Sequence, residues 1–456
     1  MVTASEFWRP IIRDFQPVGP VQPEEVRRFF VDRHADDPTQ SLLQLLKSSL
    51  LNNLSRDLSA SPTFYKGLLT GHVGSGKSSE LMRLGQELAD TFFVVGFDAE
   101  FTLTLETANH FDVLLGMGVA IHKEAQAARL NPRRKLTDDL LKSMAKLVRK
   151  YENRQGFTLN LEQLLKQVAT TGINYLVPGG GAAVAATVGA TKLALNVNDD
   201  FVKLLELPAN RAEVIGALNE IITWVEKKAG KPLLMITDGL DKVPVARARL
   251  FFAESALLCE PACALIYAAP IEFYHRVAAA QSSSIFDELK MLPIPPVSKR
   301  PLKGDDWRSD REAEDAGLAV MRQVVAKRLA AHSQPVDAII TPEALSMLAR
   351  SSGGVMRELI RYFRNAATFA QMTEKMQIDE TTARRAINQQ RKEIKLRLTV
   401  AHREALQRVL QQGNLSGGQP AVIEIEDELL RYLYLLSYES ADDAWFDAHP
   451  NVLAAL

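Results

Sequence analysis

A run of glycines followed by a lysine and two serines stands in the segment GHVGSGKSS, residues 71–79. The spacing of Gly71, Gly76, Lys77 and Ser78 satisfies G-x-x-x-x-G-K-[ST], with an apolar run before it and a helical pattern after it. Glycines let successive backbone N–H groups turn toward phosphate oxygens, and the N-terminus of a following helix adds partial positive charge. We therefore expect an ATP site, with Lys77 at the β- and γ-phosphates and Ser78 as a Mg²⁺ ligand. The residues expected to surround the phosphates are Gly71, His72, Val73, Gly74, Ser75, Gly76, Lys77, Ser78 and Ser79.

Two carboxylates follow a second apolar run, in the segment LLMITDGLDK. Asp238 stands where a buried strand would end, so it can hold Mg²⁺ through water beside Ser78. Asp241 comes shortly after it and is a candidate to orient or polarise the attacking water. Capping of the following helix is the alternative interpretation of Asp241, and a plain D-G turn is the alternative interpretation of Asp238.

These residues need a scaffold, and the composition is that of a soluble globular protein. The chain has 456 residues, of which 46% are hydrophobic and 24% charged, and its net charge of −1 produces no overall field toward nucleic acid or membrane. Cys259 and Cys263 have no second pair that would complete a zinc site, so we expect buried free thiols and a reducing, cytoplasmic location. The first residues show no signal-peptide pattern. The Gly/Ala-rich stretch 172–196 contains Pro178 and Lys192, which favours a loop or hairpin over a membrane span.

Alternating strand and helix patterns divide the chain. Continuous apolar strands between helices predict an α/β core with a mainly parallel sheet covered on both faces. We expect an N-terminal helical segment at 1–60, the core at 61–298 with an insertion at about 101–210, a helical lid at 299–395, and a small C-terminal domain at 396–456.

The two motifs together resemble the Walker A and Walker B motifs of P-loop NTPases of the AAA+/STAND type, over about residues 60–375. The likeness is closest to bacterial STAND-like and origin-recognition-like ATPases. It implies a sensor 1 strand at CALIYAAPIEF, although that segment has no Asn or Thr at its tip, and a sensor 2 arginine after the glycine pair in SSGGVMREL, which is Arg357. It also implies an arginine finger, for which Arg276 is the best candidate. Gly239 stands where motor ATPases place a catalytic glutamate, so we expect slow hydrolysis.

The last part of the chain begins with a basic segment. Residues 384–397 carry several arginines and lysines against a single glutamate, which is typical of a solvated helix face, and phosphate contact with nucleic acid is the alternative. The segments after it resemble the small winged-helix-like ending of several of these ATPases.

Three functions remain open at this level. The first is a Mg²⁺-dependent ATPase switch that forms homo-oligomers and controls a protein effector, with anti-phage defence as a plausible setting. The second is an origin-recognition-like or transposition-related DNA-binding ATPase. The third is a nucleotide-binding scaffold without turnover.

Overall fold

The computed structural model describes most of the chain in several stretches. They are residues 3–17, 28–33, 41–54, 64–130, 208–277, 285–300, 312–332, 334–416, 419–439 and 444–454. The Gly/Ala-rich stretch 172–196 and most of the predicted insertion lie outside the described residues.

A five-stranded parallel sheet forms the centre of the core, in the order β2-β3-β4-β1-β5. Because all neighbouring strands are parallel, helices must carry the chain back across the sheet between them, as the alternating pattern of the sequence predicted. The fold class is confirmed: a mainly parallel α/β sheet followed by a helical lid and a small C-terminal domain. The strands are β1 (Lys66–Thr70), β2 (Phe93–Asp98), β3 (Leu233–Asp238), β4 (Ala264–Ala268) and β5 (Glu288–Met291).

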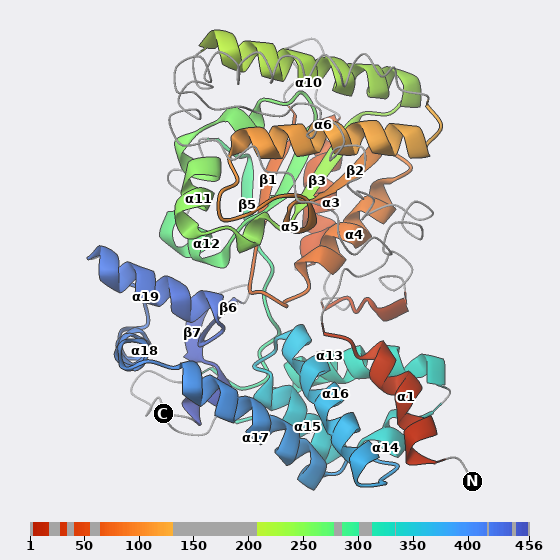
Figure 1. Cartoon of the computed structure of the whole chain (residues 1–456), viewed down its shortest axis with the longest axis vertical. Coiled ribbons are helices and arrows are strands. Elements are labelled where there is room, and N and C mark those ends of the chain that lie inside the picture. The colour runs from red at the N-terminus through yellow and green to blue at the C-terminus, as the bar shows by residue number, and fades with distance from the viewer. Residues whose placement is uncertain are drawn as a thin grey trace, which may run out of the picture.

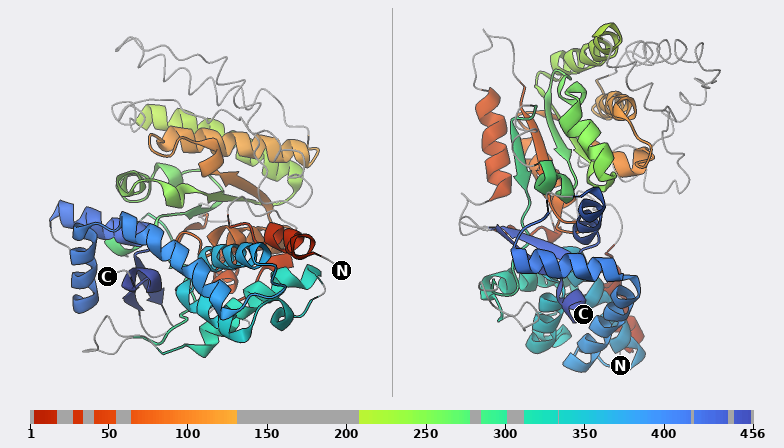
Figure 2. Two further views of the ribbon diagram at one scale, coloured as in Figure 1. Left: turned by 60° about the horizontal axis from the view of Figure 1, so that its bottom comes forward. Right: turned by 90° about the vertical axis from the view of Figure 1, so that its left-hand side faces the viewer.

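Helices cover both faces of this sheet (Figure 2). Alternate strand residues point to opposite faces, so Leu233 and Met235 belong to one hydrophobic cluster while Leu234 and Ile236 belong to the other. One face packs against α3 and α4, and the other against α6 and α10. The bounds of these helices are α3 (Leu42–Leu54), α4 (Lys77–Leu88), α6 (His110–Ala127) and α10 (Pro208–Ala229). The shorter elements of the core are α5 (Ala99–Thr102), η1 (Leu240–Lys242), α11 (Val245–Arg249), η2 (Leu250–Glu254), η3 (Leu257–Cys259) and α12 (Ile271–Val277).

The lid is a helical bundle below the core (Figure 1). It also includes the first helix of the chain, α1 (Ala4–Asp14), which packs against α16. The ring of Phe15 stacks on that of Phe363 at a centroid distance of 3.9 Å, and Trp8 donates a hydrogen bond to the carbonyl of Lys375 at 2.7 Å. The helices α1 and α3, which we expected in one segment at 1–60, thus belong to the lid and to the core, respectively. The lid helices are α13 (Asp315–Leu329), η5 (Ala330–His332), α14 (Val336–Ile339), α15 (Pro342–Ser351), α16 (Met356–Met372) and α17 (Glu380–Arg397).

The C-terminal domain lies against both core and lid (Figure 1). Two helices precede an antiparallel hairpin, which is a winged-helix-like arrangement. Its elements are α18 (Val400–Gln412), α19 (Pro420–Arg431), β6 (Leu435–Glu439), β7 (Ala444–Ala448) and α20 (Pro450–Leu453). Across the described residues, no helix is both long and apolar enough to cross a membrane.

Candidate nucleotide-binding site

The glycine-rich loop connects the end of β1 to the start of α4. Gly74 and Gly76 have φ angles of +85° and +104°, which side chains rarely adopt. A Cβ at Gly74 would lie 2.7 Å from the Cβ of Arg357, so the lid also leaves no space for a side chain there. The helix α4 begins at Lys77, and its free N–H groups face the loop.

Lys77 is held over the loop by three acceptors. Its ammonium donates to the carbonyls of Gly71 (2.7 Å) and His72 (3.0 Å), and it forms an ion pair with Asp241 at 2.8 Å. Both side chains of the ion pair are less than a tenth exposed. Burial by itself raises the pKa of Asp241, but the charge and hydrogen bond of Lys77 outweigh it and hold this pKa below its ordinary value. Asp241 is therefore ionised at neutral pH.

Asp238 has the opposite electrostatic environment. Burial and the neighbouring charge of Asp241 raise the pKa of Asp238, against the hydrogen bonds from Ser78 and from the N–H of Gly239. A buried carboxylate of this kind is stabilised by a bound cation. The hydroxyl of Ser78 and the carboxylate of Asp238 are oxygen donors of the type that Mg²⁺ prefers. No group of three or more His, Cys, Asp or Glu side chains in the described stretches is arranged to hold a metal, so phosphate oxygens would have to complete the coordination.

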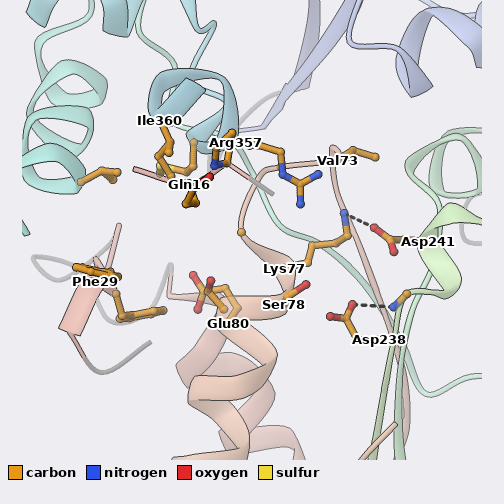
Figure 3. Close-up of a pocket in the computed structure, with 18 of the residues that line it drawn as sticks. Gln16, Phe29, Val73, Lys77, Ser78, Glu80, Asp238, Asp241, Arg357 and Ile360 are labelled. Carbon is orange, nitrogen blue, oxygen red and sulfur yellow. Dashed lines mark hydrogen bonds and ion pairs between the residues drawn. The ribbon is translucent and has the colours of Figure 1, made fainter. Parts of the chain in front are cut away.

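These side chains line one cavity of about 600 Å³ between the core and the lid (Figure 3). The core contributes the loop and the ends of β2 and β3, and the lid contributes residues of α13 and α16. In Figure 3, Lys77 points toward Asp241, while Ser78 and Asp238 lie next to them. Four predicted site residues thus come together from separate parts of the sequence: Lys77, Asp238, Asp241 and Arg357.

Arg357 lies at the first turn of α16, directly against the loop. Its backbone N–H donates to the carbonyl of Gly74 at 3.1 Å, and its positive charge contributes to the lowered pKa of Asp241. This position between lid and core agrees with the place that we expected for a sensor 2 arginine. Its role toward the γ-phosphate stays a prediction.

Arg276, the candidate arginine finger, lies elsewhere. It does not line the cavity; its guanidinium bonds the carboxylates of Asp427 and Glu426 on α19, each at 2.7 Å. It also donates to the carbonyls of Ser416 (2.5 Å) and Ile423 (3.3 Å). Every nitrogen of the guanidinium is hydrogen-bonded to the C-terminal domain, so in this arrangement Arg276 does not present a free donor to a nucleotide.

Residues that precede the glycine-rich loop in the chain also line the cavity, and the sequence analysis did not predict them. The cavity is also lined by Gln16, Phe29, Phe30, Val31 and Arg33, and the Arg328 guanidinium lies 5.0 Å above the ring of Phe29. Arg33 donates to the carbonyl of Pro293 at 2.5 Å and to that of Ser75 in the loop. It also opposes the effect of burial on Glu80 of α4, whose pKa is raised to about 7. No motif marks the residues before the loop, because the contacts that hold them at the cavity are long-range.

Asp98 was also missed. It ends β2 beside Asp238, and burial together with the charge of Asp238 raises its pKa to about 7. It lines the same cavity. The available signal was its place at the end of the apolar run FFVVGFD.

His72 connects the loop to the C-terminal domain. Its Nε2 accepts a hydrogen bond from the backbone N–H of Ser437 in β6, at 2.7 Å. Burial, with the nearby charges of His275 and Lys77, lowers the pKa of His72 to about 3, so the ring is neutral at physiological pH. A second contact joins the C-terminal domain to the lid, since the hydroxyl of Tyr438 donates to the carbonyl of Gly353 at 2.9 Å. The cysteines Cys259 and Cys263 are free thiols, and burial raises both pKa values to about 12.

Comparison with known proteins yields solved structures only. No family model matches the sequence, and no curated protein matches it. The chain is similar to the ADP form of the ORC2 protein of Aeropyrum pernix, with 13% identity, 96% of this chain and 93% of that chain covered, and a TM-score of 0.43. It is also similar to Cdc6p from Pyrobaculum aerophilum (12% identity, 97% and 94% covered, TM-score 0.40). A third similar structure is the RuvB Holliday junction branch migration motor of Thermotoga maritima (11% identity, 88% and 90% covered, TM-score 0.35).

Proposed function

We propose that this protein is a Mg²⁺-dependent ATPase of the AAA+ type that binds ATP between core and lid. The observation that carries the proposal is the convergence of Lys77, Asp238, Asp241 and Arg357 on one cavity next to a glycine-rich loop. The loop amides and Lys77 would bind the phosphates, and Ser78 and Asp238 would hold Mg²⁺, which offsets charge on the phosphates as the γ-phosphate leaves.

The geometry favours slow turnover and a switch function. Position 239 carries no carboxylate. The strand β4 ends at Ala268 and is followed by Ala269 and Pro270, none of which can bond a γ-phosphate through a side chain. By contrast, Arg357 lines the cavity from the lid and would place a positive charge near the γ-phosphate, where ATP and ADP differ. A ligand shifts a conformational equilibrium only by its different affinity for the two states, so the γ-phosphate would decide how firmly the lid closes. We further propose that lid closure controls self-assembly of the protein and its action on a protein effector, with anti-phage defence as one setting.

DNA binding is the second candidate. The exposed side chains of α17 support it, since Arg384, Arg385, Lys392, Lys395 and Arg397 all reach solvent. The second helix of the C-terminal domain argues against it. In α19, Glu424, Glu426, Asp427 and Glu428 stand against Arg431 alone, and the helix packs on α12 of the core. A helix that is acidic and covered is poorly suited to a groove of DNA.

The test of the proposal compares wild-type protein with Lys77→Ala in ATP binding and phosphate release. Lys77 supplies a charged hydrogen bond to the phosphates, worth about 1.5–3 kcal/mol, so ATP affinity should fall roughly tenfold to a hundredfold and turnover should be lost. Lys47→Ala is the matched control, because Lys47 pairs with Glu87 on the far side of α4 and does not line the cavity. A folded Lys77→Ala protein with unchanged affinity and turnover would overturn the assignment. If the wild-type protein binds ATP but releases no phosphate, it is a nucleotide-binding scaffold without turnover. A DNA mobility shift that depends on salt and is lost when the charges of α17 are reversed would support DNA binding.

A further inference from the structure

The carboxyl ends of β2 and β3 place two aspartates side by side. The strands are parallel neighbours, and their register pairs Asp98 directly with Asp238. Both side chains are buried, with residue exposures of 8% and 5%, and both line the nucleotide cavity. A second carboxylate thus lies next to the expected Mg²⁺ ligand, on the strand beside it.

The position after Asp238 has no space for a side chain. Gly239 has a φ of +84°, and a Cβ there would lie 2.6 Å from the backbone nitrogen of Glu100 and 3.1 Å from Oδ1 of Asp98. The glycine is therefore required by the approach of β2 and the segment after it. Asp98 occupies the space next to Asp238 that a side chain at position 239 would enter.

One carboxylate oxygen of Asp98 accepts a hydrogen bond that orients the side chain, and the other is available to accept a hydrogen bond from water. Its Oδ1 accepts the N–H of Phe101 at 3.2 Å and so caps α5. Within the described part of the chain, no hydrogen bond involves Oδ2. A carboxylate that is oriented by a cap and still has a free acceptor oxygen can bind a water molecule in a defined position.

The other acidic residues that line the cavity are already committed. Asp241 forms the ion pair with Lys77. Glu100 pairs with Lys242. Glu80 lies in the first turn of α4 and interacts with Arg33, while Asp238 is the expected Mg²⁺ ligand.

We propose that Asp98 is the catalytic carboxylate that orients the attacking water and accepts its proton. This inference rests on the proposed ATPase function. The water oxygen forms a bond to the γ-phosphorus, and the bond between that phosphorus and the oxygen of ADP breaks. The proton released from the water passes to Asp98 and from there to the phosphate products. Water and ATP are the only reactants, and ADP and inorganic phosphate are the only products.

The experiment compares Asp98→Asn with the wild-type full-length chain. Asparagine caps helices about as well as aspartate, so the cap of α5 and the fold should persist. Phosphate release in a single turnover should fall by about 10² or more, the range over which general base catalysis acts. The affinity for ATP and its dependence on Mg²⁺ should stay within about threefold of wild type, since the phosphate and metal contacts remain. After incubation with ATP, chromatography of the bound nucleotide should show ATP in Asp98→Asn and ADP in wild type.

Two controls make the outcomes separable. Asp90→Asn makes the same chemical change at an exposed turn after α4 and should behave as wild type. Asp238→Asn should lose the Mg²⁺ dependence of ATP affinity, which Asp98→Asn keeps. If Asp98→Asn hydrolyses ATP at the wild-type rate, this inference is overturned and the ATPase function remains intact. The same conclusion follows if Asp98→Asn loses the Mg²⁺ dependence of ATP binding to the same extent as Asp238→Asn. A wild-type protein that releases no phosphate would overturn the ATPase function together with this inference.

Discussion

Replacement of Arg276 by alanine should weaken the docking of the C-terminal domain on the core. Arg276 lies on α12, and its guanidinium makes two charged contacts to α19, next to the ion pair of Glu272 with Arg431. The side chain of Arg276 is 11% exposed, that of Glu426 is 0% exposed and that of Asp427 is 11% exposed, so solvent screens these ion pairs little.

The expected cost follows from what the alanine leaves behind. Removal of one partner of a buried ion pair costs about 3–5 kcal/mol, because an uncompensated charge remains. Glu426 keeps its bonds to Arg408 (2.7 Å) and to the hydroxyl of Ser416 (2.8 Å), whereas Asp427 loses its ion pair with Arg276. We therefore expect the lower end of this range, about 3 kcal/mol.

The assay is limited proteolysis combined with thermal unfolding. Faster cleavage within the last 60 or so residues and a lower first transition should accompany Arg276→Ala, since about 3 kcal/mol corresponds to a roughly hundredfold change in the docked population. Arg276→Lys should be intermediate, because an ammonium cannot reproduce the planar fork. Arg322→Ala is the surface control: its pair with Asp337 has side-chain exposures of 46% and 57% and should contribute little.

Two results would refute this reasoning. Unchanged proteolysis and melting in Arg276→Ala would show that the α19 contacts do not hold the domain. A loss of phosphate release at unchanged stability would instead restore Arg276 as an arginine finger.

Three further predictions concern the cavity. Asp238→Asn should bind ATP in EDTA as wild type does but gain no affinity from Mg²⁺, because an amide is a poorer partner for the metal; calorimetry with and without Mg²⁺ measures this, and an unchanged gain would contradict it. Arg357→Ala should bind ADP normally yet lose about tenfold or more in ATP affinity, together with any ATP-dependent change in mass by mass photometry; persistence of that change would exclude the sensor role. His72 should contribute stability that is complete above its unfolded pKa of about 6.5 and lost as the pH falls toward its folded value of about 3, since its protonated ring cannot accept from Ser437. Urea unfolding of His72→Gln should therefore depend less steeply on pH between about 4 and 6, by up to about 1.4 kcal/mol per pH unit, and identical slopes in the two proteins would refute this.

Much of the fold and part of the site follow from local sequence patterns. The glycine spacing before Lys77 and the apolar run before Asp238 act within a few residues, so they are visible without a structure. Apolar strands that alternate with helices likewise imply a parallel sheet, because helices must carry the chain back between parallel strands. The sequence determined the phosphate loop, the fold class and the presence of a helical lid.

Tertiary structure decided which distant residues share the cavity. Asp98 meets Asp238 only because β2 and β3 are neighbours, although more than a hundred residues separate them in the chain. Arg276 bonds α19 and not the nucleotide site, and His72 accepts a hydrogen bond from β6. Both contacts depend on the docking of the C-terminal domain, which no local sequence pattern indicates. For the same reason α1 joined the lid: the burial of Trp8 and Phe15 against α16 depends on shape complementarity over more than 300 residues of chain. Local patterns define the elements and the phosphate loop, and long-range packing determines which carboxylate, which arginine and which domain face it.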